Sequence, residues 1–330
     1  MIDSRRLPFP VLGLITLLLI GLSLLAGRYP SPGLVSLGEI RANPLAWGIL
    51  LNLRLPRVLA ALLLGAALAA SGLTFQMLFR NPLVEPGFLG VSQGAAFGSA
   101  AAILLLPKLI GSIQISAVIF ALAGLFLSYG VARRLRFGGW VIRMVISGLA
   151  VSALFSAGIG VLKYMADPLS QLQEMTFWML GGLSGVTWRR VLLMLPLVLP
   201  SLLILYLYRW RLNVLSLDDL TAHSLGSRPA GERMLLLIAA SAATAGVTAL
   251  AGIVSWVGLL VPHIARRLFG ADGSGSLPAS LLLGASMVLL CDTVSRTFLV
   301  YEIPLGILTS FLGASLFLML LSSGQVRFRR

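Results

Sequence analysis

The longest polar stretch of the sequence is RWRLNVLSLDDLTAHSLGSRPAGER, residues 209–233. The apolar runs on both sides of it are too long and too poor in charge to form the core of a water-soluble protein. The stretch must therefore lie in water between two membrane-spanning helices, because lipid cannot satisfy the polar backbone groups of a loop. Its four arginines favour the cytosolic side of the membrane.

The centre of this stretch predicts a short helix from Leu217 to Leu225. Asp218 and Asp219 suit the first turn, where carboxylates interact favourably with the helix dipole, and Gly226 suits the C-terminal stop. An ordinary solvated loop is the simpler interpretation of the same composition. The alternative is a short cytosolic helix that contacts a soluble partner.

The composition of the whole chain is that of a polytopic membrane protein. Of its 330 residues, 58% are hydrophobic and 11% are charged, against about 25% charged residues in soluble domains. The net charge of +14 does not indicate nucleic-acid binding, because no basic stripe alternates with aromatic residues and most arginines lie at the ends of apolar runs. The single cysteine, Cys291, excludes an internal disulfide and suits a small buried residue.

Ten apolar windows predict an all-α protein with about ten transmembrane helices. The eighth window is shorter than the roughly 20 residues of a full crossing, so we expect a partial helix there. An even number of spans puts both termini on one side. With the termini in the cytoplasm, 16 of the 25 basic residues lie on the cytoplasmic side. The predicted spans are 9–26, 57–78, 91–106, 113–132, 141–162, 190–208, 234–251, 253–265, 278–300 and 305–322.

Small residues and helix breaks predict how these spans pack. Glycine, alanine and serine crowd residues 65–72, 94–102 and 240–252, and such residues let helices approach closely in lipid. Proline and glycine interrupt the apolar sequence at 81–90 and 252–267. Irregular backbone at membrane depth must be buried in protein or line a cavity. One break in each half is consistent with an inverted repeat of spans two to five and seven to ten.

A further segment, residues 163–189, follows the fifth span and is moderately apolar with a helical pattern. It predicts a re-entrant or surface helix near 170–180. Its tryptophans, Trp178 and Trp188, equally fit an aromatic belt at the membrane interface.

Five blocks of sequence carry a family resemblance. The strongest is RLPRVLAALLLGAALAASGLTFQMLFRNPLVEPGFLGVSQGA at 54–95, and the others are WMLGGLSGVTW at 178–188, LSLDDLTAHSLG at 215–226, GIVSWVGLLVPHIARRLFG at 252–270, and residues 284–320. In this order they resemble the ABC importer permeases for iron-siderophores, haem and vitamin B12, the FecCD-type transmembrane subunits. The family usually has a proline where this chain has Ser315.

The resemblance implies a type II ABC importer permease fold, with residues 1–330 forming a single transmembrane permease domain in the bacterial inner membrane. The chain would form a homodimer with a translocation path at its two-fold interface. It lacks a GxxxxGK[ST] phosphate loop, so ATP and Mg²⁺ would be bound by two separate cytosolic ATPase subunits, and this chain would hold no cofactor or metal. A periplasmic binding protein would deliver a metal chelate (ferric siderophore, haem or cobalamin), although oxyanions are also carried by similar permeases.

The resemblance also assigns three sets of residues. The coupling segment, residues 209–233, would contact the ATPase. Outer arginines would receive acidic residues of the binding protein, because a guanidinium can hold a carboxylate with two hydrogen bonds, or they would anchor lipid headgroups. Small side chains of the fifth span would line the path, or its serines would bond backbone carbonyls one turn back. The sets are Leu217, Asp218, Asp219, Thr221, Ala222, His223, Ser224, Leu225 and Gly226 for coupling; Arg54, Arg57 and Arg296 for docking; and Ser147, Gly148, Ser152, Ser156 and Trp178 for the path.

An ion-coupled secondary transporter is the first alternative. Such proteins usually place ionisable groups at the bilayer centre. Asp292 is the one acid deep within a predicted span, and Arg296 is in position to pair with it across one helical turn.

An intramembrane serine protease is the second alternative, because GVSQG at 90–94 and GLSG at 182–185 resemble serine nucleophile motifs. The first follows a proline-broken turn where the motif needs a strand. The second needs a histidine base, and His223 and His263 are both expected on the side opposite Ser184. No cluster of histidine, cysteine and aspartate has metal-ligand spacing.

Overall fold

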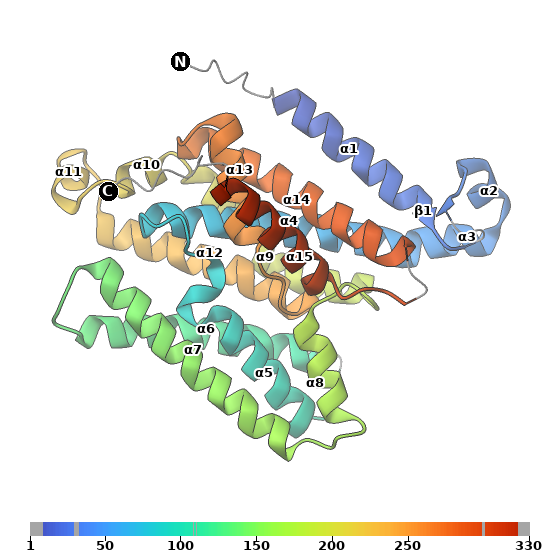
Figure 1. The fold of residues 1–330 in the computed structure, drawn as a ribbon, viewed down its shortest axis with the longest axis horizontal. Helices are drawn as coiled ribbons and strands as arrows, with labels where there is room; N and C mark the ends of the chain where they lie inside the picture. The colour runs from blue at the N-terminus through green and yellow to red at the C-terminus, as the bar shows by residue number, and fades with distance from the viewer. Residues whose placement is uncertain (1–8, 30–32, 108, 110, 299–300, 323–330) are drawn as a thin grey trace.

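The structure is a computed structural model that describes residues 9–29, 33–107, 109, 111–298 and 301–322. Ten helices lie at the ten predicted spans, which confirms the prediction of a polytopic all-α protein (Figure 1). Among the described residues, six of these helices are long and apolar enough to cross a membrane. The ten are α1 Phe9–Leu25, α4 Leu55–Leu78, α5 Val91–Leu105, α6 Ser112–Arg134, α7 Trp140–Met165, α9 Trp188–Leu207, α12 Pro229–Ala251, α13 Val257–Phe269, α14 Gly273–Thr297 and α15 Leu305–Ser322.

Short elements connect the long helices and lie mainly at the two ends of the bundle. Figure 1 shows α10 and α11 at one end and α2 and α3 at the other. The short elements are the hairpin β1 Ala26–Gly27 and β2 Gly33–Leu34, the helices α2 Leu37–Ala42, α3 Pro44–Ile49, α8 Gln171–Leu180, α10 Arg211–Leu215 and α11 Asp219–Ser224, the π-helix η1 Leu50–Arg54 and the 3-10 helix η2 Pro86–Leu89.

The second span begins earlier than its apolar window. Helical structure runs without a gap from Pro44 through α3 and η1 into α4. Asn43 starts it, because its side chain accepts hydrogen bonds from the backbone N–H groups of Leu45 and Ala46, and the proline that follows suits the first helical position. Hydropathy missed this extension because charged residues, Arg54 and Arg57, interrupt the apolar run.

The partial helix expected at the eighth span is confirmed. Helix α13 has 13 residues, too few for a full crossing. It starts after the break at 252–256, where Trp256 adopts a left-handed backbone conformation with φ of 72°. Such a conformation is rare for a bulky residue, so the surrounding contacts must hold it.

Two helices form the centre of the bundle. The apolar windows of α4 and α12 are 78% and 83% buried within the chain, whereas those of α6, α7 and α9 are 39%, 33% and 28% buried. Helix α4 packs against α14, α12, α13 and α9. The less buried helices therefore present their apolar surfaces to lipid or to a partner chain.

The stretches of small residues lie where the central helices touch. Gly65 of α4 faces Gly284 of α14 so closely that a Cβ on either residue would collide with the backbone carbonyl of the other. Gly72 meets the carbonyl of Gly258 in the same way, and the Ser71 hydroxyl donates a hydrogen bond of 2.9 Å to the Ala240 carbonyl of α12. Tight packing through small residues is the arrangement that the sequence predicts.

The two halves of the chain repeat one packing pattern. Helix α4 packs on α14, and its counterpart α12 packs on α6. Helix α5 packs on α6 and α7, and its counterpart α13 packs on α14 and α15. These pairings match the expected correspondence of spans two to five with seven to ten.

We predict that Gly65→Ala destabilises the protein by about 1–3 kcal/mol, because the added methyl group forces apart two backbones in contact. Thermal unfolding in detergent measures the effect. The control is Gly130→Ala in α6, where a Cβ would meet nothing within 4 Å. Equal unfolding temperatures for the two variants would contradict the assigned helix contact.

Candidate functional site

The short helix predicted within residues 209–233 is present, and its two ends lie as expected. Asp218 is the N-cap of α11: its carboxylate accepts hydrogen bonds from the Thr221 backbone N–H at 3.0 Å and from the Thr221 hydroxyl at 2.8 Å. Gly226 lies just beyond the helix with a left-handed φ of 75°. These bonds hold the pKa of the Asp218 carboxyl below its ordinary value, because they favour the charged form.

Helix α11 is attached to the two central helices. Asp219 forms an ion pair of 2.6 Å with Arg233, which lies on α12 and is 8% exposed. The carbonyl of Leu217, two residues before the start of α11, accepts a hydrogen bond from Arg80, two residues beyond the end of α4. The Arg233 guanidinium also donates to the carbonyl of Leu215 in α10. Movement of α11 is therefore tied to α4 and α12.

The outer surface of α11 carries exposed leucines in a polar segment. Leu220 is 84% exposed, and Leu217 and Leu225 on either side of the helix are exposed as well. The side chains of His223 and Ser224 are also exposed, whereas Ala222 is buried. Apolar side chains that project from a polar surface are typical of a site that binds another protein.

The predicted docking arginines are engaged inside the chain. Arg57 of α4 donates to both carboxylate oxygens of Asp292 at 2.9 and 3.1 Å and to Glu302 at 2.7 Å. Asp292 is buried and also lies 3.7 Å from the Nε of Arg296. The expected pair within α14 is thus present, but the closer partner of Asp292 comes from a helix 235 residues away in sequence.

The other two arginines hold the end of α1. Arg54 donates to the carbonyls of Leu24 and Tyr29 at 2.9 and 2.8 Å, and Arg296 donates to the carbonyl of Ala26 at 2.8 Å. These side chains stabilise the β1–β2 hairpin and its junction with α4 and α14. Docking to a binding protein stays a prediction for all three arginines.

A charged cavity of about 480 Å³ lies beside α8; we call it the α8 cavity. Trp178 lines it together with Arg57 and Asp292, so a residue predicted for the path and one predicted for docking share one cavity. Helix α8 itself confirms the helix predicted near 170–180. Ser184 also lines the cavity, but no histidine is among the described lining residues, so a base for serine catalysis is missing there.

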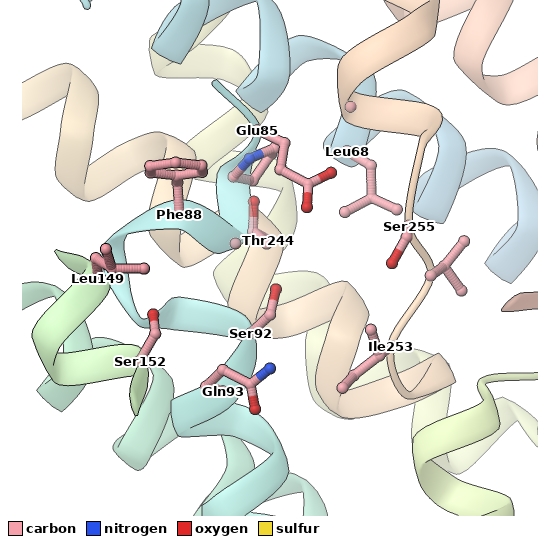
Figure 2. A pocket seen from close by; sticks show the side chains of 14 residues that line it. Leu68, Glu85, Phe88, Ser92, Gln93, Leu149, Ser152, Thr244, Ile253 and Ser255 are labelled. Atoms are coloured by element: carbon pink, nitrogen blue, oxygen red, sulfur yellow. The ribbon is translucent and has the colours of Figure 1, made fainter. Parts of the chain in front are cut away.

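The two helix breaks meet in a second cavity of about 230 Å³, the central cavity, at the middle of α4, α7 and α12. Figure 2 shows the side chains of Glu85, Ser92, Thr244 and Ser255 around it. The first break contributes Glu85 and η2, and the second contributes residues 253–255. Broken backbone at this depth lines a cavity, as the sequence predicts.

Glu85 joins the two breaks directly. Its carboxylate lies close enough to the backbone N–H of Trp256, the residue with the left-handed conformation, for the two groups to attract each other. The Trp256 side chain packs against Gly313 of α15, and its ring centroid lies 5.9 Å from that of Phe317. A continuous set of contacts therefore runs from the first break to the last span.

The residues predicted to line the path on α7 do not share one surface. Ser147 and Gly148 are buried within the chain, and Gly148 packs against the carbonyl of Phe88 in η2. Ser152 lines the central cavity, and Ser156 is exposed. Ser147 has no hydrogen-bond partner within the described chain, so the alternative of back-bonding one turn earlier does not apply to it.

The remaining motifs take structural positions. Ser92 of GVSQG lies in the first turn of α5 after a 3-10 helix, which differs from the strand–turn–helix of a nucleophile motif. The ring of His263 bonds to the carbonyl of Leu259 one turn earlier, at 3.0 Å. Within the described residues, no group of three His, Cys, Asp or Glu side chains could hold a metal ion.

Comparison with known proteins agrees with this architecture. The sequence matches the FecCD transport family over residues 14–323. It is 36% identical to the hemin transport system permease protein HmuU of Yersinia pestis, over 97% of each chain, and 36% identical to the molybdate import system permease protein MolB of Haemophilus influenzae, over 94% of each. A solved inward-facing metal-chelate type ABC transporter has a TM-score of 0.88 and 35% identity, covering 95% of this chain and 98% of that one.

The fold and its helix breaks define an inner-membrane transport permease of the ABC importer type. The chain belongs to the FecCD transport family.

The ion pair between Arg57 and Asp292 is the site contact that sequence reasoning missed. The sequence did contain a signal for this pair, because a carboxylate inside a span needs a cationic partner and Arg57 is the first residue of the second predicted span. Sequence spacing, however, indicated only the neighbour on the same helix, Arg296.

We predict that Asp292→Asn destabilises the folded protein by about 3–5 kcal/mol, because it leaves Arg57 and Arg296 without their buried counter-charge. Glu302→Gln removes a more exposed partner of Arg57 and is expected to cost about 1 kcal/mol or less. Thermal unfolding of the two variants in the same detergent measures the difference. Similar losses for both would contradict the central role of Asp292.

We predict that the order of α11 depends on pH through Asp218. Because its pKa is lowered in the folded state, the stabilisation is complete above the ordinary pKa of about 3.9 and is lost as the pH falls through the folded value. Hydrogen exchange of the α11 amides should therefore show less protection in acid. Asp218→Asn keeps a capping oxygen without a charge and should remove this dependence; an unchanged pH profile in that variant would assign the effect to another group.

Proposed function

We propose that this chain is the transmembrane subunit of an ATP-driven importer, working as a homodimer with two cytosolic ABC ATPase subunits. The observation that carries the proposal is the anchored helix α11, which exposes Leu220 at a water-facing end and is bonded to the two central helices. The whole chain acts as one permease domain. ATP and Mg²⁺ are held by the ATPases, since no phosphate loop occurs in the sequence and no cofactor or metal is assigned to this chain.

The proposed orientation places both termini and the coupling segment in the cytoplasm. The concentration of arginines at the α10–α11 end of the bundle supports it. The α8 cavity then lies on the periplasmic side, where a binding protein delivers cargo. Arg57 is the predicted docking residue best placed to meet cargo or a binding-protein carboxylate, because it lines that cavity.

The proposed cargo is a metal chelate such as a ferric siderophore, haem or cobalamin. The relatives support the class, since one is described as a hemin permease and the solved structure as a metal-chelate type transporter. A bulky chelate needs a wide path with weakly polar walls. Trp178 at the α8 cavity and Ser152 at the central cavity supply such walls, and Ser156 adds an exposed hydroxyl on α7.

In the proposed mechanism, closure of the ATPase pair moves α11 and, through Arg80 and Arg233, the central helices α4 and α12. ATP binding drives the change only because the ATPases bind the two permease states with different affinity. The contact between Glu85 and Trp256 connects the same motion to α15. The two copies would rock between outward-facing and inward-facing states.

An ion-coupled secondary transporter is the second candidate, because Asp292 is a buried acid within a span. Its carboxylate oxygens accept hydrogen bonds from Arg57 and lie beside Arg296, so arginine side chains already occupy the positions that a coupling ion would need. Uptake into vesicles separates the two candidates. ATP-dependent uptake that needs the ATPase subunit and survives an uncoupler supports the importer, whereas uptake without ATPase that collapses with the uncoupler supports the ion-coupled carrier.

We predict that Leu220→Glu lowers ATPase binding about tenfold or more, because it places a charge in the centre of an apolar contact. Affinity of purified ATPase for the permease in nanodiscs measures the loss. Phe137→Glu is the matched control, since Phe137 is also an exposed apolar residue, 53% accessible, in the loop between α6 and α7. Equal losses in both variants, or none in Leu220→Glu, would remove the assignment of α11 as the ATPase contact.

A further inference from the structure

A third cavity, of about 390 Å³, lies where the ends of α6, α7 and α12 meet helix α11. We call it the arginine pocket. Three arginines line it, Arg133, Arg143 and Arg233, and the one carboxylate among its described lining residues belongs to Asp219. Three positive charges against one negative charge leave a local excess of two. The ATP-driven transport proposed above uses the pair of Arg233 with Asp219 but gives no role to Arg133 or Arg143.

The arginines keep capacity to bind an anion. Arg233 is buried, and its Nε is shielded from solvent without a hydrogen-bond partner in the described chain. The Nε of Arg143 is also buried without a hydrogen-bond partner in the described chain, although another nitrogen of that guanidinium donates to the carbonyl of Leu135 at 3.1 Å. A buried N–H donor without a partner destabilises the folded protein, so a bound hydrogen-bond acceptor beside these arginines would stabilise the pocket.

The rest of the lining is apolar or aromatic. Met144, Met234 and Leu237 form part of the wall. The guanidinium of Arg233 lies 5.5 Å from the centre of the Trp140 ring, and that of Arg133 lies 5.9 Å from the centre of the Tyr129 ring. Arginine and aromatic side chains over apolar walls match the headgroup level of a bilayer, where phosphate and acyl chain meet.

The location of the arginine pocket in the fold also suits binding of a lipid. The ends of α6 and α7 line the pocket, and these two helices are mostly unburied within the chain. Ile142 and Ile146, next to Arg143 on α7, are exposed apolar residues. A lipid whose phosphate entered the pocket could therefore lay its acyl chains on adjacent apolar surface.

We propose that the arginine pocket binds a phosphate group carried by an anionic phospholipid. Planar guanidinium groups suit phosphate oxygens, which accept paired hydrogen bonds. Because Arg233 also pairs with Asp219 at 2.6 Å, an occupied pocket places the lipid phosphate next to the anchor of α11. The lipid would thus contact the same residue that ties the coupling segment to α12.

The test is native mass spectrometry of the full-length protein in neutral detergent, titrated with phosphatidylglycerol, with phosphatidylcholine or with inorganic phosphate. We expect selective retention of phosphatidylglycerol. The double variant Arg133→Gln/Arg143→Gln should weaken it roughly 25-fold, since each arginine near an anionic lipid contributes about fivefold. The matched control is Arg134→Gln/Arg136→Gln, which removes two nearby charges that do not line the pocket.

Equal weakening in the two double variants would overturn the site, as would retention without preference for phosphatidylglycerol over phosphatidylcholine. Displacement of the lipid by millimolar inorganic phosphate would assign the pocket to free phosphate and overturn the lipid. If the first double variant fails to fold, Arg133→Glu alone repeats the test, because Arg133 lies exposed on the Tyr129 ring. Undiminished retention in that variant would count against the proposal.

Discussion

The whole arrangement depends on backbone contact between helices that carry almost no side chains at their crossing points. In lipid, moving an apolar helix surface from acyl chains to a neighbouring helix gains little free energy, because both environments are apolar. Close van der Waals contact must therefore hold the helices together. Gly65 against Gly284 and Gly72 against Gly258 provide that contact for α4. Because α4 and α12 can thereby sit at the centre, the two broken segments reach each other and enclose the central cavity. Larger side chains at these crossings would separate the breaks.

Charged groups inside the chain secure the opposite end from α11. Arg57 bridges α4 to α14 and to the segment before α15, while Arg54 and Arg296 bind carbonyls at the end of α1. Arginine suits both tasks, since its fork of donors can satisfy several oxygens at once. These bonds mean that charge reversal at such a residue would disturb folding as well as any docking, so loss of binding-protein capture alone would not identify the docking surface.

Much of the architecture was predictable from sequence because the bilayer restricts it. The apolar windows of the sequence predicted the positions of all ten helices of the bundle. Asp218 and Gly226 predicted the two ends of α11. Contacts distant in sequence were not predictable. No local pattern connects Arg57 with Asp292 or brings Glu85 to Trp256. The serines of α7 show the same limit: the resemblance assigned Ser147 and Ser156 to one path, but neighbouring helices bury the first and leave the second exposed.

Helix α11 has six residues, far fewer than the roughly 12 that a helix needs to be marginally stable alone in water. Its order is supplied by the Asp218 cap and by its bonds to Arg233 and Arg80. Such an element has little freedom to bend, because unwinding it also breaks its attachments. A load applied to its exposed leucines is therefore transmitted, through the attachments at residues 217–219, to the two most buried of the candidate spans.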